Sequence, residues 1–175
     1  RELRRLVAAA GGSALTSAYH VAVRIPPGPG QFSPALVDHV KLFPNRPDIR
    51  FEFRIHEQIL PALRAAGVPI SFSDIYVVHQ NYDRSDEGQA LKRVRDFHLL
   101  ELELRDRPEH PFVLYNLGMT YLEATRDYEV AAHYLCRCLD RVDPDASIVR
   151  KAHAMLVSAY LRLEEWERAL EANEA

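Results

Sequence analysis

The 175-residue sequence has only two cysteines and no long apolar run, and its charges nearly balance. Cys136 and Cys138 would project about 200° apart on a helix, so they cannot easily form a disulfide bond or bind the same metal ion. We expect structural thiols in a reducing, cytoplasmic compartment. No apolar stretch approaches the roughly 20 residues that a membrane-spanning helix needs. The net charge of −3 gives no reason to expect a surface that binds nucleic acid.

An initiator methionine and the hydrophobic core of a secretion signal are also missing from the start of the chain, Arg1-Glu2-Leu3-Arg4-Arg5. These residues fit the end of a helix rather than a natural amino terminus. We therefore expect the chain to be the carboxy-terminal part of a longer protein.

The first part of the chain, residues 1–85, has the pattern of a mixed α/β structure. Strands are expected over residues 18–25, 37–43, 49–55 and 73–79, and helices over residues 1–11 and 58–66. Within the third segment Ile49, Phe51, Phe53 and Ile55 alternate with charged residues, as in a half-buried strand. The Pro- and Gly-rich loop at 26–30 lacks the glycine spacing and the Lys-Ser/Thr end of a phosphate-binding P-loop.

From about residue 86 the apolar period becomes helical. A first helix is expected to close at Pro108, and four more over residues 111–124, 128–141, 147–163 and from 165 onward. The predicted fold class is therefore α+β, with a boundary near residue 85 and an all-helical part over residues 86–175.

Within the helical part the motif Leu117-Gly118-x-x-Tyr121 returns as Leu156-Val157-x-x-Tyr160. A leucine, a small residue and an aromatic at this spacing let two helices of a hairpin pack closely. The segment resembles tetratricopeptide repeats, and its first copy has one extra residue in the turn. Such repeats bind a protein partner or brace a neighbouring domain.

A histidine and a carboxylate, His56 and Glu57, directly follow the third predicted strand. These side chains bind divalent metals and transfer protons. The pair does not form a zincin site, because Leu60 stands where that motif needs its second histidine. On the residues alone, a polar strand end with Glu57 near a helix amino terminus remains the alternative.

An ordered series of short motifs extends around this pair: Lys41–Arg46, Ile49–Phe51, Ile55–Glu57, Ile75–Tyr82, Lys92–Arg95 and Leu99–Glu101. The series resembles the carboxy-terminal third of bacterial family 2 glycosyltransferases that carry tetratricopeptide repeats. Two positions depart from that pattern, since Pro44 replaces a usual arginine and Gln80-Asn81 replaces a bulkier or Gly-containing pair.

The resemblance implies an incomplete GT-A-like domain over residues 1–85 that helps transfer a sugar from a nucleotide-sugar donor to an acceptor. Such enzymes use a divalent metal, Mg or Mn, held by an Asp-x-Asp motif, and no such motif precedes His56. We therefore expect the donor-binding half to precede Arg1 in the full-length protein, and the fragment alone to be inactive.

The resemblance also assigns roles to single residues. It implies that His56 is a metal or diphosphate ligand, that Glu57 is the catalytic carboxylate, and that His79 lies on the same rim. Arg50 and Arg54 could donate charge-assisted hydrogen bonds to a phosphate, and the alternative is that they are solvated charges on the polar face of the predicted strand. A further basic face is formed by Lys92, Arg93 and Arg95, for which a solvated surface is the stronger interpretation.

Two other functions remain open. The helical repeats could dock a protein partner, with the α/β part serving only as a platform. Alternatively, His56, His79 and Glu57 could form the centre of a metallohydrolase.

Overall fold

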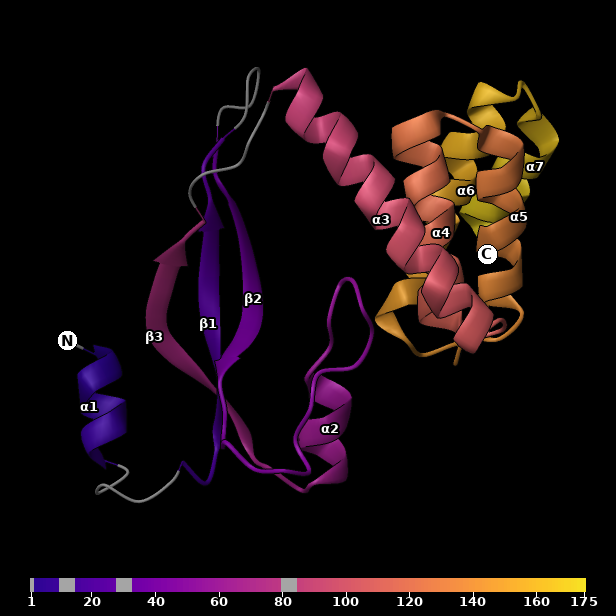
Figure 1. Cartoon of the computed structure of the whole chain (residues 1–175). Helices are drawn as coiled ribbons and strands as arrows, with labels where there is room; N and C mark the ends of the chain where they lie inside the picture. The colour runs from indigo at the N-terminus through magenta and orange to yellow at the C-terminus, as the bar shows by residue number, and fades with distance from the viewer. Residues whose placement is uncertain (1, 10–14, 28–32, 80–84) are drawn as a thin grey trace. The chain divides into compact units, whose positions relative to one another are not determined.

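The computed structural model describes residues 2–9, 15–27, 33–79 and 85–175. The chain divides into two compact units, residues 1–84 and 85–175. The first contains a three-stranded mixed sheet and the second an array of packed helices, which makes the protein α+β (Figure 1). Most of the loop at 26–30 and the Gln80-Asn81 pair lie outside the described residues.

In the first unit the central strand of the sheet is β1 (Ala18–Ile25). It pairs antiparallel with β2 (Ala35–Leu42) and parallel with β3 (Ile70–Val78), so the strand order is β2-β1-β3. These bounds confirm three of the four predicted strands. The parallel pairing requires a crossover, and α2 (Leu60–Ala65) lies in it. A further helix, α1 (Glu2–Ala9), precedes the sheet.

The predicted strand over residues 49–55 is wrong. Only Glu52 makes an isolated bridge, with Gln58, and Phe53 has a φ of 68°, which a strand cannot contain. Ile49 and Ile55 are buried, but Phe51 between them is 58% exposed, so the alternation does not define one buried face. The apolar residues anchor two separate points of a loop on the core.

The core of the first unit lies between the sheet and α2. It is a cluster of buried aliphatic side chains: Ala18, Val40, Ile49, Ile59, Leu63 and Val68. Leu63 is the fully buried residue of α2, and Gly67, with a φ of 64°, turns the chain after the helix. This packing fixes the loop and the start of α2 against β2.

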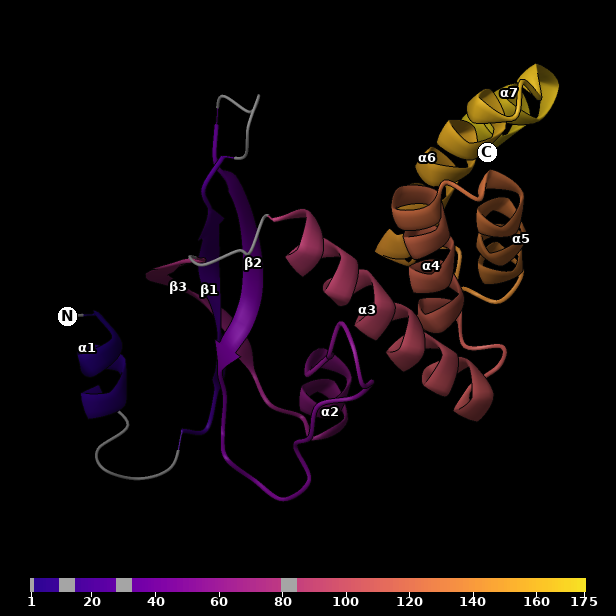
Figure 2. The ribbon, with the colours of Figure 1, turned by 45° about the horizontal axis from the view of Figure 1, so that its top comes forward.

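The second unit consists of successive antiparallel helices that pack in sequence order from α4 onward (Figure 2). Its elements are α3 (Asp86–Asp106), α4 (Pro111–Thr120), the π-helical turn η1 (Tyr121–Thr125), α5 (Tyr128–Leu139), α6 (Ser147–Arg162) and α7 (Trp166–Glu174). The predicted helices are confirmed, apart from the π-helical end of the second. No helix within the described residues is long and apolar enough to cross a membrane.

Helix starts in this unit follow from local side chains. The Ser85 hydroxyl accepts a hydrogen bond from the Gly88 amide at 3.0 Å and caps α3, and Asp127 caps α5 through the Val130 amide at 3.2 Å. Pro111 opens α4 at its first turn, where its missing N–H costs nothing.

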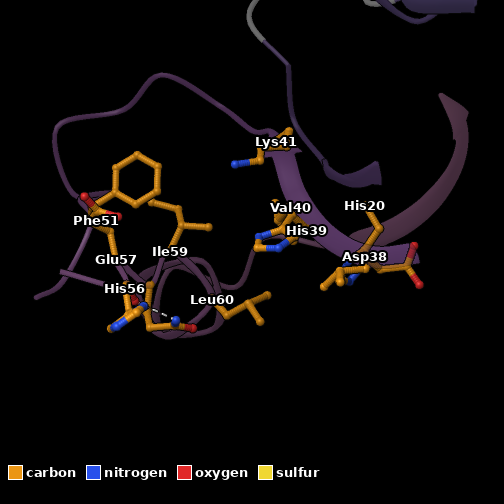
Figure 3. A pocket seen from close by; sticks show the side chains of 12 residues that line it. His20, Asp38, His39, Val40, Lys41, Phe51, His56, Glu57, Ile59 and Leu60 are labelled. Atoms are coloured by element: carbon orange, nitrogen blue, oxygen red, sulfur yellow. Dashed lines mark hydrogen bonds between the residues drawn. The ribbon is translucent and has the colours of Figure 1, made fainter. Parts of the chain in front are cut away.

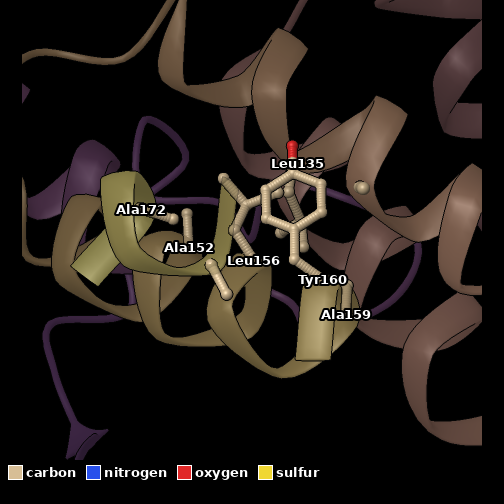
Figure 4. Packing of buried hydrophobic residues seen from close by; sticks show 8 residues of the cluster. Leu135, Ala152, Leu156, Ala159, Tyr160 and Ala172 are labelled. Carbon is tan, nitrogen blue, oxygen red and sulfur yellow. The ribbon is translucent and has the colours of Figure 1, made fainter. Parts of the chain in front are cut away.

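Close helix packing in the second unit depends on small residues. A Cβ added at Gly118 would lie 2.6 Å from the Leu135 Cγ, so α4 and α5 could not keep their separation with a larger residue there. This confirms the predicted role of a small residue in the motif. The adjoining core is built from alanines around a few large side chains (Figure 4), namely Ala132, Leu135, Ala152, Leu156, Ala159, Tyr160, Ala169 and Ala172.

Both cysteines are free thiols on α5. Cys138 is fully buried, and this burial raises its pKa to about 11, so the thiol stays protonated at neutral pH. The Cys136 sulfur lies 3.4 Å from the Tyr160 hydroxyl of α6. These positions support the expectation of structural rather than reactive thiols.

Candidate functional site

A pocket of about 630 Å³ lies in the first unit, between β2 and the loop that leads into α2 (Figure 3). Its lining includes both members of the predicted His-Glu pair and side chains of two strands. The residues are His20, Val37, Asp38, His39, Val40, Lys41, Phe51, His56, Glu57, Gln58, Ile59 and Leu60.

The loop that carries His56 and Glu57 is closed by the bridge between Glu52 and Gln58. The Glu52 amide donates to the Gln58 carbonyl at 2.8 Å, and the Gln58 amide donates back at 3.0 Å. The two predicted site residues therefore reach the pocket from a tight turn, and not from the end of a strand. This corrects the position expected from the alternating pattern.

The backbone of His56 is held in a left-handed conformation, with a φ of 55°. For a residue with a Cβ this costs about 1–2 kcal/mol. The Gln58 side-chain amide donates to the His56 carbonyl at 2.8 Å and helps to hold this geometry. Strained non-glycine residues cluster at functional sites, so the conformation supports a functional hypothesis for this turn.

The opposite wall of the pocket comes from β2, which contributes Asp38, His39 and Lys41. Sequence reasoning assigned no chemistry to these residues. Lys41 opens the first motif of the glycosyltransferase-like series, and that signal could have singled it out. Asp38 and His39 carry no such signal, because only the fold sets them opposite the turn.

Partial burial lowers the pKa of His39, and the neighbouring Lys41 charge lowers it further, while Asp38 opposes the shift. The lowered pKa favours the neutral imidazole, which can accept a proton or a hydrogen bond. Because the unfolded chain binds this proton more readily, the shift reduces stability as the pH falls below about 6.5.

A third imidazole, that of His20, reaches the pocket from β1. Its ring stacks on Phe72 of β3, with ring centroids 4.7 Å apart and planes inclined by 18°. The His20 Nδ1 is buried and makes no hydrogen bond within the described structure. Together with Lys41, His39 and His56, this ring makes the pocket rich in nitrogen groups.

Three of the predicted site residues do not line the pocket. Arg50 donates to the carbonyls of Arg46 and Ile49 at 3.2 and 3.3 Å, so its guanidinium braces the preceding turn. Arg54 is an exposed residue of the turn. His79 follows β3, where its amide donates to the Arg24 carbonyl at 2.9 Å. The structure thus brings His56 and Glu57 together and leaves the other three outside.

The side chains that the structure describes do not form a self-contained metal site. Among the described residues, no group of three or more His, Cys, Asp or Glu side chains could hold a metal ion. The metallohydrolase centre of His56, His79 and Glu57 is therefore not assembled. Of the metal ligands that the resemblance implies, the pocket contains only His56.

The basic face expected on α3 is explained by an ion-pair network. Lys92 Nζ lies 2.6 Å from one Asp96 carboxylate oxygen, and Arg95 Nη2 lies 2.7 Å from the other. Asp96 is only 6% exposed. The side chains of Lys92 and Arg95 are 40% and 63% exposed, and Arg93 is also exposed, so the solvated face that we expected is present and two of its cations also pair with Asp96.

Comparison with models of known protein families found no match for this chain, and comparison with curated proteins found none either.

Proposed function

We propose that this chain is the acceptor-side part of a family 2 glycosyltransferase, joined to tetratricopeptide-like helices. The observation that carries the proposal is the pocket of the first unit. Lys41 and the His56-Glu57 pair belong to separate motifs of the resembling series, and they line opposite walls of one cavity of about 630 Å³. A pocket of that size suits a sugar-containing ligand.

The side chains of the pocket can perform two tasks in sugar transfer. Glu57, an exposed carboxylate at the rim, accepts the proton of the acceptor hydroxyl as that oxygen attacks the sugar. Lys41 places a positive charge in the same cavity, and His56, which the resemblance implies is a diphosphate ligand, lines it as well. Both can oppose the negative charge that develops on the departing diphosphate. Neither of these steps depends on a metal ion.

The proposal is tested with His56→Asn in the full-length parent protein. Asparagine tolerates the left-handed backbone, so the substitution removes the imidazole without adding strain. We expect sugar transfer to fall at least about tenfold, equivalent to about 1.4 kcal/mol in transition-state stabilisation, while the melting temperature stays nearly unchanged.

The matched control is Arg64→Gln, an exposed position on α2 that does not line the pocket. It should retain full transfer. Wild-type turnover by His56→Asn would contradict the assignment. The 175-residue chain by itself should transfer no sugar, and detectable transfer by it would show that the donor-binding half is not needed.

A second candidate function is a protein-binding module without catalysis. Three large apolar side chains of α6 and α7 are exposed: Leu161 at 46%, Trp166 at 59% and Leu170 at 59%. Exposed apolar side chains of this size mark partner surfaces when they are contiguous. This candidate is preferred if the parent protein transfers no sugar from any nucleotide-sugar donor.

A further inference from the structure

The turn between α4 and α5 differs from a regular helical hairpin. The last residues of the first helix form the π-helical turn η1 at Tyr121–Thr125. The sequence has one extra residue in this turn relative to the repeat pattern, and a π turn is how a helix absorbs an insertion. Such turns are rare and occur frequently at functional sites.

Directly after η1, Arg126 adopts a left-handed conformation with a φ of 59°. Helices commonly end in this conformation, but the residue there is usually glycine or asparagine. Its guanidinium forms no ion pair or hydrogen bond within the described part of the chain. An unfavourable residue therefore occupies the position without any contact that explains it.

Arg126 lines a second pocket, of about 300 Å³, which lies within the helical unit. The other lining residues are Leu122, Tyr128, Ser158 and Arg162. Arg162 comes from the last turn of α6, in the next hairpin, and its guanidinium is likewise unpaired among the described residues. Two unpaired arginines from separate hairpins thus share one cavity.

The lining of this pocket carries two positive charges and no carboxylate, on a chain whose net charge is −3. The adjacent acid, Asp127, does not line the pocket, because it caps α5 through the Val130 amide. The Ser158 hydroxyl donates to the Ala154 carbonyl at 3.0 Å. The side-chain groups that can still donate hydrogen bonds to a ligand are the two guanidinium groups and the Tyr128 hydroxyl.

We propose that this pocket binds the phosphate group of a small phosphomonoester. Guanidinium groups match the oxygens of phosphates and carboxylates in bidentate geometry. A phosphomonoester carries nearly two negative charges at neutral pH and balances both arginines, whereas a carboxylate leaves one charge unbalanced. The volume of about 300 Å³ is at the lower end for ligand sites, which favours a small molecule over a peptide.

The test is a titration of the 175-residue chain with inorganic phosphate at pH 8, followed by amide NMR shifts. We expect saturable shifts confined to residues 122–128 and 158–162. Acetate at the same ionic strength should bind at least about tenfold more weakly, because a monoanion balances only one guanidinium. Equal affinity for acetate would overturn the assignment to a phosphate dianion.

Three variants complete the test. Arg126→Gly removes the guanidinium and suits the left-handed backbone, so the protein should remain folded while phosphate affinity falls about tenfold. Adding Arg162→Gln should abolish the saturable shifts. Arg150→Gln, an exposed arginine of α6 outside the pocket, should leave binding unchanged. Shifts that persist in the double variant, or that never saturate in the wild type, would show solvated surface arginines only.

Discussion

At the scale of the residue, each of the two pockets described above is lined by one left-handed non-glycine residue. Four described non-glycine residues have positive φ: Phe53, His56, Arg126 and Glu164. His56 lines the pocket of the first unit and Arg126 lines that of the second. Each such residue costs about 1–2 kcal/mol relative to a relaxed backbone, so the surrounding structure must compensate.

A substitution at Gly118 tests the packing of α4 against α5 at the scale of a single residue. Alanine normally stabilises a helix interior by about 1 kcal/mol relative to glycine. At Gly118, however, the new Cβ would meet the buried Leu135 side chain at 2.6 Å, and overpacking of this kind costs about 1–3 kcal/mol. We expect Gly118→Ala to reduce the free energy of unfolding, as measured by urea denaturation.

The control for this prediction is Gly67→Ala, where no atom lies within 4 Å but the φ is 64°. It should cost about 1 kcal/mol through the backbone alone. A Gly118→Ala protein more stable than the wild type would show that α4 and α5 can separate freely.

At the scale of the element, α3 is organised around a buried carboxylate. Burial raises the pKa of Asp96, but hydrogen bonds from Lys92 and Arg95 outweigh this effect and hold the pKa below its usual value. The folded pKa is therefore lower than the unfolded one. The corresponding stability is present above about pH 4 and is lost as the pH falls through the folded pKa.

We expect Asp96→Asn to lower the free energy of unfolding at pH 7 by about 1–3 kcal/mol, because two cations lose their partner. In the variant, the free energy of unfolding should also fall less steeply at acid pH than it does in the wild type. Denaturation between pH 2.5 and 7 measures both effects. The exposed Asp145→Asn is the control, and an identical acid dependence of wild type and Asp96→Asn would contradict the assignment.

At the scale of the whole molecule, each of the two compact units has its own core. We therefore expect two transitions in calorimetry. Leu63→Ala, at a fully buried position of the first unit, should lower the midpoint temperature of only one transition. The expected loss in the free energy of unfolding of that unit is about 2–5 kcal/mol. Gly118→Ala should lower the midpoint temperature of only the other transition.

The fluorescence of Trp166, the sole tryptophan of the sequence, identifies the transition of the helical unit. A single transition that both substitutions shift equally would show that the units unfold together. This outcome would favour one cooperative core over two.

The sequence by itself determined the elements whose signal is local. Helical periodicity and prolines placed the helices of the second unit, and β-branched runs placed β1, β2 and β3. The small residue at Gly118 was also readable, because close helix packing leaves a fixed spacing along the chain. These features depend on near neighbours, which the order of residues specifies directly.

Only the tertiary structure decided how the remaining residues are used. Alternation around Phe51 predicted a strand, but alternation does not specify a partner strand, and here the chain turns back through the bridge between Glu52 and Gln58. The pocket joins that turn to β2, and the second pocket joins Arg126 to Arg162. Such groupings arise from packing between distant segments, and no local pattern encodes them.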